Sequence, residues 1–328
     1  MLKAEQLKKS YSLKEKSGWF RRKKNLIQTV DGLDLSIDKG EIVGLLGVNG
    51  AGKTTTIKML STLLTPTSGK IAIDGVDAVR EPERMKQKIN MIAGGERMLY
   101  WRLTARENLY YFGRLYGLSG KLLGERCAYL LDLVGLNEAA DRPVERYSKG
   151  MKQRLQIARG LINDPEYLFL DEPTLGLDAL VARQLRQTVK GLAKERGKGI
   201  LLTSHYLDEV EELCDRVYII DKGRPLLQGT PEKIIRTVVH VFHLQAVIEN
   251  EQQANVTWLT RELEKRNIEV RSDPVQEGQL LRMTASFDLT LPFLKLSAER
   301  GLLLKKLEAV KPNLEDAIVQ LARESDAS

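Results

Sequence analysis

The chain has 328 residues, of which 42% are hydrophobic, and it carries a formal net charge of +7. This length predicts two domains rather than one compact core, and the hydrophobic share excludes a disordered chain. The two cysteines are too few for a disulfide framework, which fits a reducing cytosol, and no apolar run is long enough to span a membrane. We also expect no export signal, because the first residues contain no apolar core.

Basic residues crowd the N-terminal part, and residues 12–25 read as a polar, basic surface insertion with Trp19 and Phe20 in its middle. Such a segment indicates nucleic acid, an anionic membrane surface or only a solvated face, and the sequence leaves these alternatives open. On either side, residues 2–7 and 33–37 alternate polar and apolar side chains, which predicts half-buried antiparallel strands.

The next stretch, Gly47–Thr55, has the phosphate-loop pattern G-x-x-x-x-G-K-[ST] between an apolar run and the start of a helix. In this context the backbone N–H groups of the loop and the dipole of the helix bind polyphosphate. Lys53 would reach the β- and γ-phosphates, and the Thr54 hydroxyl would ligate Mg²⁺. The other loop residues that we expect to bind ATP are Gly47, Asn49, Gly50, Ala51, Gly52 and Thr55.

Beyond the loop, the pattern becomes helical from about residue 97 to residue 164, which predicts a helical subdomain. An apolar run then delivers Asp171 and Glu172 to the carboxyl end of a buried strand, where open α/β sheets place their ligands. We expect Asp171 to hold Mg²⁺ and Glu172 to deprotonate the attacking water, because a carboxylate on the metal cannot also be the base. His205, after a further strand, is expected near the γ-phosphate.

Residues 147–151 begin another helix, with Ser148 as its N-cap and Gly150 allowing close approach of a neighbour. A helix start of this kind can bind an anion. Because the phosphate loop already supplies one anion site, a second one suggests that ATP lies between two subunits.

With these motifs in this order, the chain resembles the ATPase subunits of ABC transporters, on the branch that exports drugs, sodium, polysaccharides or similar cargo. Gly47–Thr55 corresponds to the Walker A motif, Tyr167–Glu172 to Walker B, Tyr147–Met151 to the signature, Pro173–Asp178 to the D-loop and His205 to the switch histidine. The resemblance implies an α/β P-loop NTPase fold over residues 1–230, with a mixed core sheet, an antiparallel β subdomain and a helical subdomain.

The resemblance also implies the mode of action. The subunit would form a homodimer, or a heterodimer with a similar ATPase subunit, around two ATP and Mg²⁺. It would hydrolyse ATP at the cytoplasmic face of the membrane and power a separate polytopic permease, with no nucleic acid as a partner. By the same resemblance Tyr11 stacks on adenine, Ser148 and Gly150 contact the γ-phosphate held by the opposite subunit, and Asp178 belongs to the ATP site.

One departure from the family concerns the loop after the strand at residues 89–93. The family has a glutamine there that contacts Mg²⁺, whereas this chain has Gly95 at the corresponding position and Glu96 beside it. We hypothesise that Glu96 replaces the missing amide as a metal contact. The alternative is a flexible turn whose glutamate faces solvent.

The last part of the chain, residues 238–328, has the order βαββαβ followed by a helix, which predicts a small ferredoxin-like α+β domain. We find no catalytic group in it, and its role in dimer contact, regulation or partner docking stays open.

Two other functions compete with transport. An ABC ATPase that acts on ribosomes or DNA could use the basic N-terminal segment, but this chain has one ATPase half and no sustained heptads. A nucleotide-binding regulator without turnover would have no need of Glu172 and His205. The cargo is not encoded in the sequence of such a subunit.

Overall fold

The computed structural model describes residues 1–17, 21–93, 99–239, 241–249, 253–276 and 278–326. The chain divides into two compact units, Met1–Pro231 and Glu232–Ser328. No helix in the described residues has the length and the apolar character needed to cross a bilayer.

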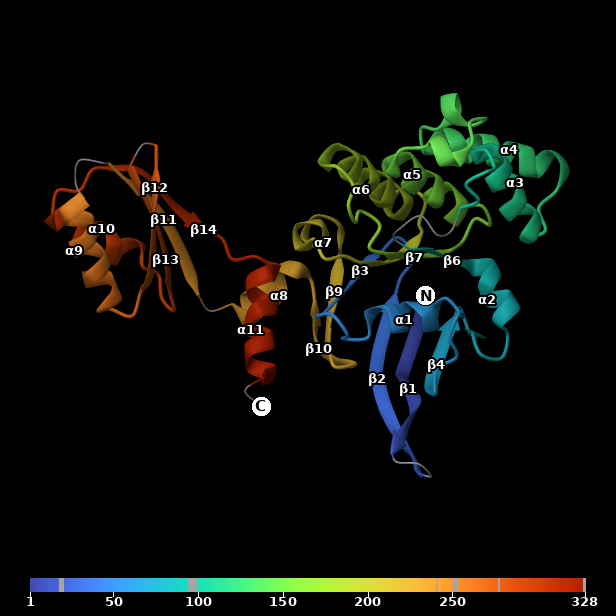
Figure 1. Ribbon diagram of the computed structural model, residues 1–328, viewed down its shortest axis with the longest axis horizontal. Helices are drawn as coiled ribbons and strands as arrows, with labels where there is room; N and C mark the ends of the chain where they lie inside the picture. Colours follow the sequence, from blue (N-terminus) through green and yellow to red (C-terminus); the bar gives the residue numbers. More distant parts are fainter. Residues whose placement is uncertain (18–20, 94–98, 240, 250–252, 277, 327–328) are drawn as a thin grey trace. The chain divides into compact units, whose positions relative to one another are not determined.

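The first unit is built on a six-stranded sheet with the order β10-β9-β3-β8-β7-β6 (Figure 1). All neighbouring pairs in it are parallel except β9 and β10, so the sheet is mixed, as predicted. Its inner strands are continuous apolar runs because helices and a second sheet cover both of its faces. The strands are β3 (Ile42–Leu46), β6 (Ile89–Ala93), β7 (Tyr167–Asp171), β8 (Gly199–Thr203), β9 (Arg216–Asp221) and β10 (Arg224–Gly229).

One face of this sheet packs on helix α1 and on an antiparallel sheet with the order β2-β1-β4-β5. The opposite face is covered by α5, α6 and α7 (Figure 1). Alternate strand residues such as Val43, Phe169 and Leu201 enter the shared core with the antiparallel sheet. The bounds are α1 (Lys53–Leu60), α6 (Ala179–Lys194), α7 (Leu207–Leu213), β1 (Leu2–Ser17), β2 (Arg21–Ile37), β4 (Ser68–Ile73) and β5 (Val76–Asp77).

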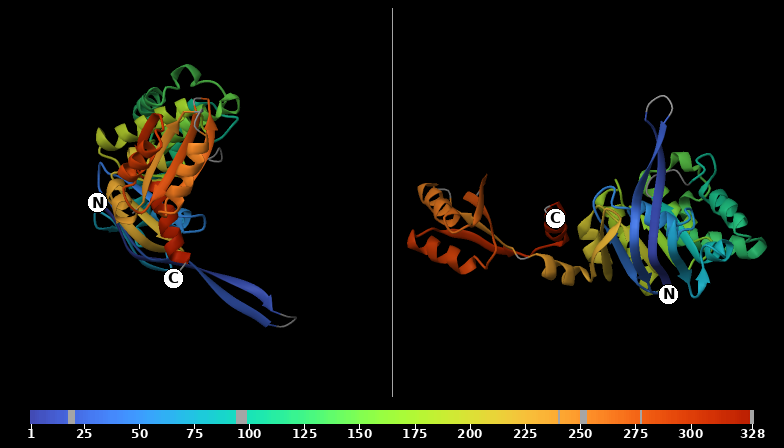
Figure 2. Two further views of the ribbon diagram at one scale, coloured as in Figure 1. Left: turned by 90° about the vertical axis from the view of Figure 1, so that its left-hand side faces the viewer. Right: turned by 90° about the horizontal axis from the view of Figure 1, so that it is seen from below.

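Strands β1 and β2 are much longer than the sequence predicted, and they form an arm (Figure 2). Their ladder continues from the pair Ser12↔Leu26 to the pair Ser17↔Arg21, so the described part of residues 12–25 is strand. Its sequence shows neither an alternation of apolar residues nor an apolar run, so the pattern predicted no strand there. Trp19 and Phe20 lie outside the described residues.

The predicted helical subdomain contains α3 (Ala105–Leu115), α4 (Gly120–Leu133) and α5 (Lys149–Gly160), with two 3₁₀ turns between the last two. Helix α3 begins at a capping box. The Glu107 backbone N–H donates to Thr104 Oγ1 at 3.1 Å, and the Thr104 N–H donates to Glu107 Oε2 at 2.8 Å. This arrangement satisfies two N–H groups that a helix start otherwise leaves unpaired. The 3₁₀ turns cover Asn137–Ala139 and Val144–Arg146, and α2 (Pro82–Lys88) precedes β6.

The second unit contains an antiparallel sheet with the order β12-β13-β11-β14. Helices α9 and α10 pack on one face, where alternate residues such as Leu244, Ala246 and Met283 are buried. The sequence predicted this series of elements with ends shifted by a few residues, but it missed β10 and α8 (Pro231–Val238) at the division between the units. The bounds are β11 (Phe242–Ile248), α9 (Gln253–Glu264), β12 (Glu269–Val275), β13 (Gly278–Ala285), α10 (Thr290–Glu299), β14 (Leu304–Val310) and α11 (Leu314–Asp326).

Candidate functional site

The phosphate loop encloses a small cavity at the end of β3 where α1 begins. The cavity has a volume of about 170 Å³ and is lined by Thr29, Glu172 and the continuous run Asn49–Thr55. Two glycines are required sterically. A Cβ at Gly47 would lie 2.2 Å from the Ile220 carbonyl oxygen, and one at Gly52 would lie 2.6 Å from that of Thr29. Both have a positive φ, which favours glycine, and Gly52 leaves the start of α1 without a side-chain cap.

Lys53 holds its charge inside this loop. Its side chain is only 9% exposed, and Nζ donates to the carbonyl oxygens of Gly47 at 2.6 Å and Val48 at 3.2 Å. Burial lowers the pKa of Lys53, while the nearby carboxylates of Glu172 and Asp171 act in the opposite direction. A buried ammonium whose partners are two neutral carbonyls would gain from a polyanion beside it.

The acidic residues come from the carboxyl end of β7, next to the end of β8. Asp171 pairs in register with Thr203, whose Oγ1 donates to Asp171 Oδ1 at 2.6 Å. Glu172 has a φ of 52°, an uncommon left-handed conformation for a residue other than glycine. Its N–H donates to the carbonyl oxygen of Thr203 at 3.0 Å, which holds this strained turn in place.

The turn brings the side chain of Glu172 against His205. Glu172 Oε1 lies 2.8 Å from His205 Nε2, and Glu172 also lines the phosphate-loop cavity. Strands β7 and β8 are neighbours in the sheet, so two residues far apart in sequence meet at one edge. The structure therefore brings Lys53, Asp171, Glu172 and His205 into one region at the ends of β3, β7 and β8.

Comparisons with known proteins place this chain in a family. The family model described as ABC transporter matches residues 30–175. The ABC transporter ATP-binding protein NatA of Bacillus subtilis is 44% identical over 215 residues, which is 66% of this chain and 87% of that protein. The daunorubicin/doxorubicin resistance ATP-binding protein DrrA of Streptomyces peucetius is 44% identical over 206 residues, 63% of this chain and 62% of that protein.

The chain belongs to the ABC transporter ATP-binding proteins. Among solved structures, an ATP-binding subunit of an ABC transporter is 32% identical, with a TM-score of 0.60, and the match covers 72% of this chain and 92% of that one. A dimeric ATP-binding cassette with bound ADP and Pi is 26% identical, with a TM-score of 0.62 over 70% of this chain and 98% of that one. The chain is thus an ATPase of this family, which couples ATP hydrolysis to transport.

The signature and D-loop residues of this ATPase lie together, away from the lining of the cavity. Ser148 caps α5 by accepting from the Met151 N–H at 3.3 Å, and Asp178 caps α6 by accepting from the Val181 N–H at 3.0 Å. The two helix starts touch, since a Cβ at Gly150 would lie 2.9 Å from Val181 Cγ1. In the described residues, Ser148, Gly150 and Asp178 do not line the phosphate-loop cavity.

Two further predicted residues are Tyr11, which does not line that cavity, and Glu96. Tyr11 is on β1, half exposed, paired with Ile27, and has Lys9 Nζ 5.5 Å from its ring centroid. Glu96, proposed to replace the family glutamine, lies outside the described residues, as does Gly95.

The sequence missed Thr203 and Glu209. Thr203 lies at the end of β8, beside Asp171. Aligning this strand in parallel with the strand that ends at Asp171 would have revealed this contact. Glu209, on α7, is 3% exposed, and its Oε2 accepts from Thr174 Oγ1 at 2.8 Å and from Ser204 Oγ at 2.6 Å. An acidic residue in the first turn of a short helix gives no sequence signal that it is buried.

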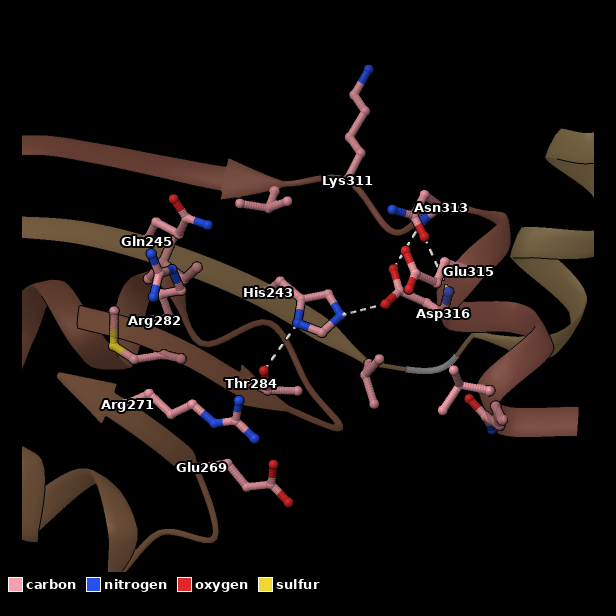
Figure 3. A pocket seen from close by; sticks show the side chains of 16 residues that line it. His243, Gln245, Glu269, Arg271, Arg282, Thr284, Lys311, Asn313, Glu315 and Asp316 are labelled. Atoms are coloured by element: carbon pink, nitrogen blue, oxygen red, sulfur yellow. Dashed lines mark hydrogen bonds and ion pairs between the residues drawn. The ribbon is translucent and has the colours of Figure 1, made fainter. Parts of the chain in front are cut away.

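The second unit has a cavity of its own, of about 770 Å³, between the sheet and the start of α11 (Figure 3). His243 lies in its centre, with Nδ1 2.9 Å from Thr284 Oγ1 and Nε2 3.9 Å from Asp316 Oδ1. Arg271 and Arg282, directly opposite on neighbouring strands, line another part of the wall. These groups show no arrangement of nucleophile and base, so we assign no catalytic role to this cavity.

Proposed function

We propose that the protein is the ATP-hydrolysing subunit of an exporter and that two subunits close around two ATP molecules to drive a separate transmembrane permease. The observation that carries this proposal is the contact between Glu172 and His205 beside a phosphate-loop cavity that contains Lys53. Among the related proteins, the Nod factor export ATP-binding protein I of Ralstonia nicotianae supports the export branch.

In this proposal the loop binds the triphosphate. The N–H groups at the start of α1 and the Lys53 ammonium neutralise the β- and γ-phosphates. Backbone groups of the loop complete the cradle; its members are Gly47, Asn49, Gly50, Ala51, Gly52 and Thr55.

Thr54 and Asp171 are the residues that would hold Mg²⁺, and Glu96 is a further candidate. Among the described residues, no group of three or more His, Cys, Asp and Glu side chains could hold a metal ion. This suits Mg²⁺, which takes one or two protein ligands and completes its shell with phosphate oxygens and water. When bound, Mg²⁺ would neutralise charge on the phosphates.

Glu172 and His205 would act on the water. Glu172 accepts the proton of the water that attacks the γ-phosphate, since it faces the cavity and does not hold the metal. The 2.8 Å contact orients the Glu172 carboxylate against the imidazole, and His205 is placed to stabilise charge on the γ-phosphate.

The remaining nucleotide contacts would come from other surfaces. Ser148, Gly150 and Asp178 would complete the ATP site of the opposite subunit, in a homodimer or in a heterodimer with a similar ATPase. Their distance from the lining of their own cavity supports this arrangement, as do the dimeric cassettes among similar structures. Tyr11 would stack on adenine.

An exposed aromatic cluster in the helical subdomain is the surface that we propose for the permease. The rings of Tyr100, Tyr111 and Phe112 contact one another with centroids 4.8–5.9 Å apart, and both tyrosines are exposed. Exposed apolar clusters of this kind mark interaction sites. Docking there would hold the subunit at the cytoplasmic face of the membrane, with no nucleic acid as a partner.

For the second unit we propose a ferredoxin-like fold that serves as an accessory domain. The order βαββαβ, the antiparallel pairing and the position of both connecting helices on one face support this fold.

The test uses Glu172→Gln, which removes the base but retains the shape of the side chain. We expect turnover to fall by about 10²–10⁴-fold while MgATP still binds, because the loop contacts are intact. Sedimentation should show dimers with MgATP and monomers without it. Monomers carrying MgATP, or wild-type turnover, would contradict the proposal.

A matched control adds Ser148→Asp to that variant. Aspartate is also a good N-cap, so α5 should remain folded, but its charge repels the phosphate held by the other subunit. The double variant should bind MgATP and remain monomeric.

A further inference from the structure

Glu209 is a buried carboxylate that joins two separate loops. It lies in α7 and is 3% exposed, and no Lys, Arg or His of the described residues forms an ion pair with it. One of its oxygens, Oε2, accepts from Thr174 Oγ1 at 2.8 Å and from Ser204 Oγ at 2.6 Å. Burying a carboxylate is costly unless hydrogen-bond donors surround it. The two hydroxyls supply such donors, and hydrogen bonds to a carboxylate are charge-assisted and strong.

The two hydroxyls belong to the loops that carry the reacting pair. Thr174 is two residues after Glu172, and Ser204 immediately precedes His205. Ser204 Oγ also accepts from the Tyr206 N–H at 3.0 Å, so the backbone on both sides of His205 is fixed. Glu209 therefore joins the loops on either side of the 2.8 Å contact between Glu172 and His205.

We propose that Glu209 is a positioning residue for ATP hydrolysis, which holds Glu172 and His205 at their contact distance through Thr174 and Ser204. This inference rests on the proposed roles of Glu172 and His205. Thr174 also belongs to the D-loop, whose Leu177 N–H donates to the Thr174 carbonyl oxygen at 3.0 Å. Glu209 thus connects the D-loop, which we assign to the subunit interface, with the switch histidine.

The first experiment measures steady-state ATP hydrolysis by the full-length chain with Glu209→Ala. Displacement of a reacting group by about 1 Å can cost roughly 100-fold in rate, so we expect kcat to fall by about 30- to 100-fold. The KM for MgATP should change by less than about threefold, since Glu209 does not line the phosphate-loop cavity. Glu209→Gln retains an acceptor oxygen and should restore kcat to within about fivefold of the wild type.

A second set of variants separates positioning from folding. Val210→Ala, at the next residue, trims a fully buried side chain without touching either hydroxyl, so it should lower Tm and leave kcat unchanged. Thr174→Val and Ser204→Ala each remove one bond to Glu209 and should each lower kcat. In the Glu209→Ala background Thr174→Val should have no further effect, because its acceptor is gone. Ser204→Ala also removes the bond from the Tyr206 N–H, so part of its effect should persist in that background.

Wild-type kcat in Glu209→Ala, or an equal loss of kcat in Val210→Ala, would overturn the positioning role. Full additivity of Thr174→Val with Glu209→Ala would also overturn it. Failure of the proposed chemistry is distinguishable, since it would appear as wild-type turnover in Glu172→Gln. If Glu172→Gln is inactive and Glu209→Ala is fully active, only the positioning role is wrong.

Discussion

At the scale of single residues, the buried Lys53 ammonium has hydrogen-bond partners that do not neutralise its charge. Two carbonyl oxygens accept from its ammonium, and burial lowers its pKa. A charge-assisted bond to phosphate is worth about 1.5–3 kcal/mol. Lys53→Ala should therefore weaken MgATP binding by roughly 10- to 100-fold, measured by titration calorimetry. Lys58→Ala, which changes an exposed lysine of the same helix, should bind normally, and unchanged binding in Lys53→Ala would refute the assignment of the loop.

The two cysteines give a second prediction at this scale. Burial raises the pKa of the Cys127 thiol to about 11, and burial with the nearby Glu209 carboxylate also raises that of Cys214. At pH 8 only about one Cys127 in a thousand would be a thiolate, which is the reactive form. Iodoacetamide should therefore leave both thiols of the folded chain largely unmodified and should modify both in urea. Mass spectrometry measures the modification. Rapid labelling of the folded chain would show that these environments are more open than the structure indicates.

The residues that the sequence could predict are those whose chemistry is contained in one short segment. Gly47–Thr55 is one continuous loop, and Asp171 and Glu172 are consecutive, so a local pattern reveals both. Thr203 bonds to Asp171, 32 residues away, and Glu209 bonds to Thr174, 35 residues away, and no local pattern encodes such contacts. The position of Thr203 beside Asp171 follows only from the pairing of β7 with β8.

At the scale of elements, local sequence patterns predict the buried strands but not the arm formed by β1 and β2. Strands β3, β7 and β8 were predicted because burial on both faces selects continuous apolar runs. The sequence of the outer parts of β1 and β2 shows neither alternation nor an apolar run, so no local pattern identifies them. Strand β10, at the edge of the sheet, is mostly exposed and was missed for the same reason.

The start of α3 yields a prediction about stability. Thr104 and Glu107 cap this helix reciprocally, so Thr104→Ala leaves an N–H group of the first turn without its partner. The free energy of unfolding should fall by about 1 kcal/mol in urea denaturation. Thr188→Ala is a matched control, since this threonine bonds only to the Gln184 carbonyl oxygen inside α6, where alanine is the better helix former. Equal destabilisation by the two substitutions would contradict the capping role.

At the scale of the whole molecule, each of the two units has its own hydrophobic core. Residues of β1, β2, α1 and the core strands form one cluster, and residues of β11, β13, α9 and α10 form another. Every described residue that we assign to the nucleotide lies within Met1–Pro231. Among the described residues, all those that line the phosphate-loop cavity belong to the first unit.

This division predicts that a fragment of residues 1–231 folds and binds MgATP with a Kd within about threefold of the full chain, a difference of less than 1 kcal/mol. Strand β3, which leads into the phosphate loop, lies between β8 and β9, so the fragment must include both. A shorter fragment of residues 1–198 lacks these neighbours and should neither unfold cooperatively nor bind nucleotide. Calorimetry of both fragments measures their unfolding and their binding of MgATP. Tight binding by the shorter one, or none by the longer one, would mean that the sheet does not position the loop as described.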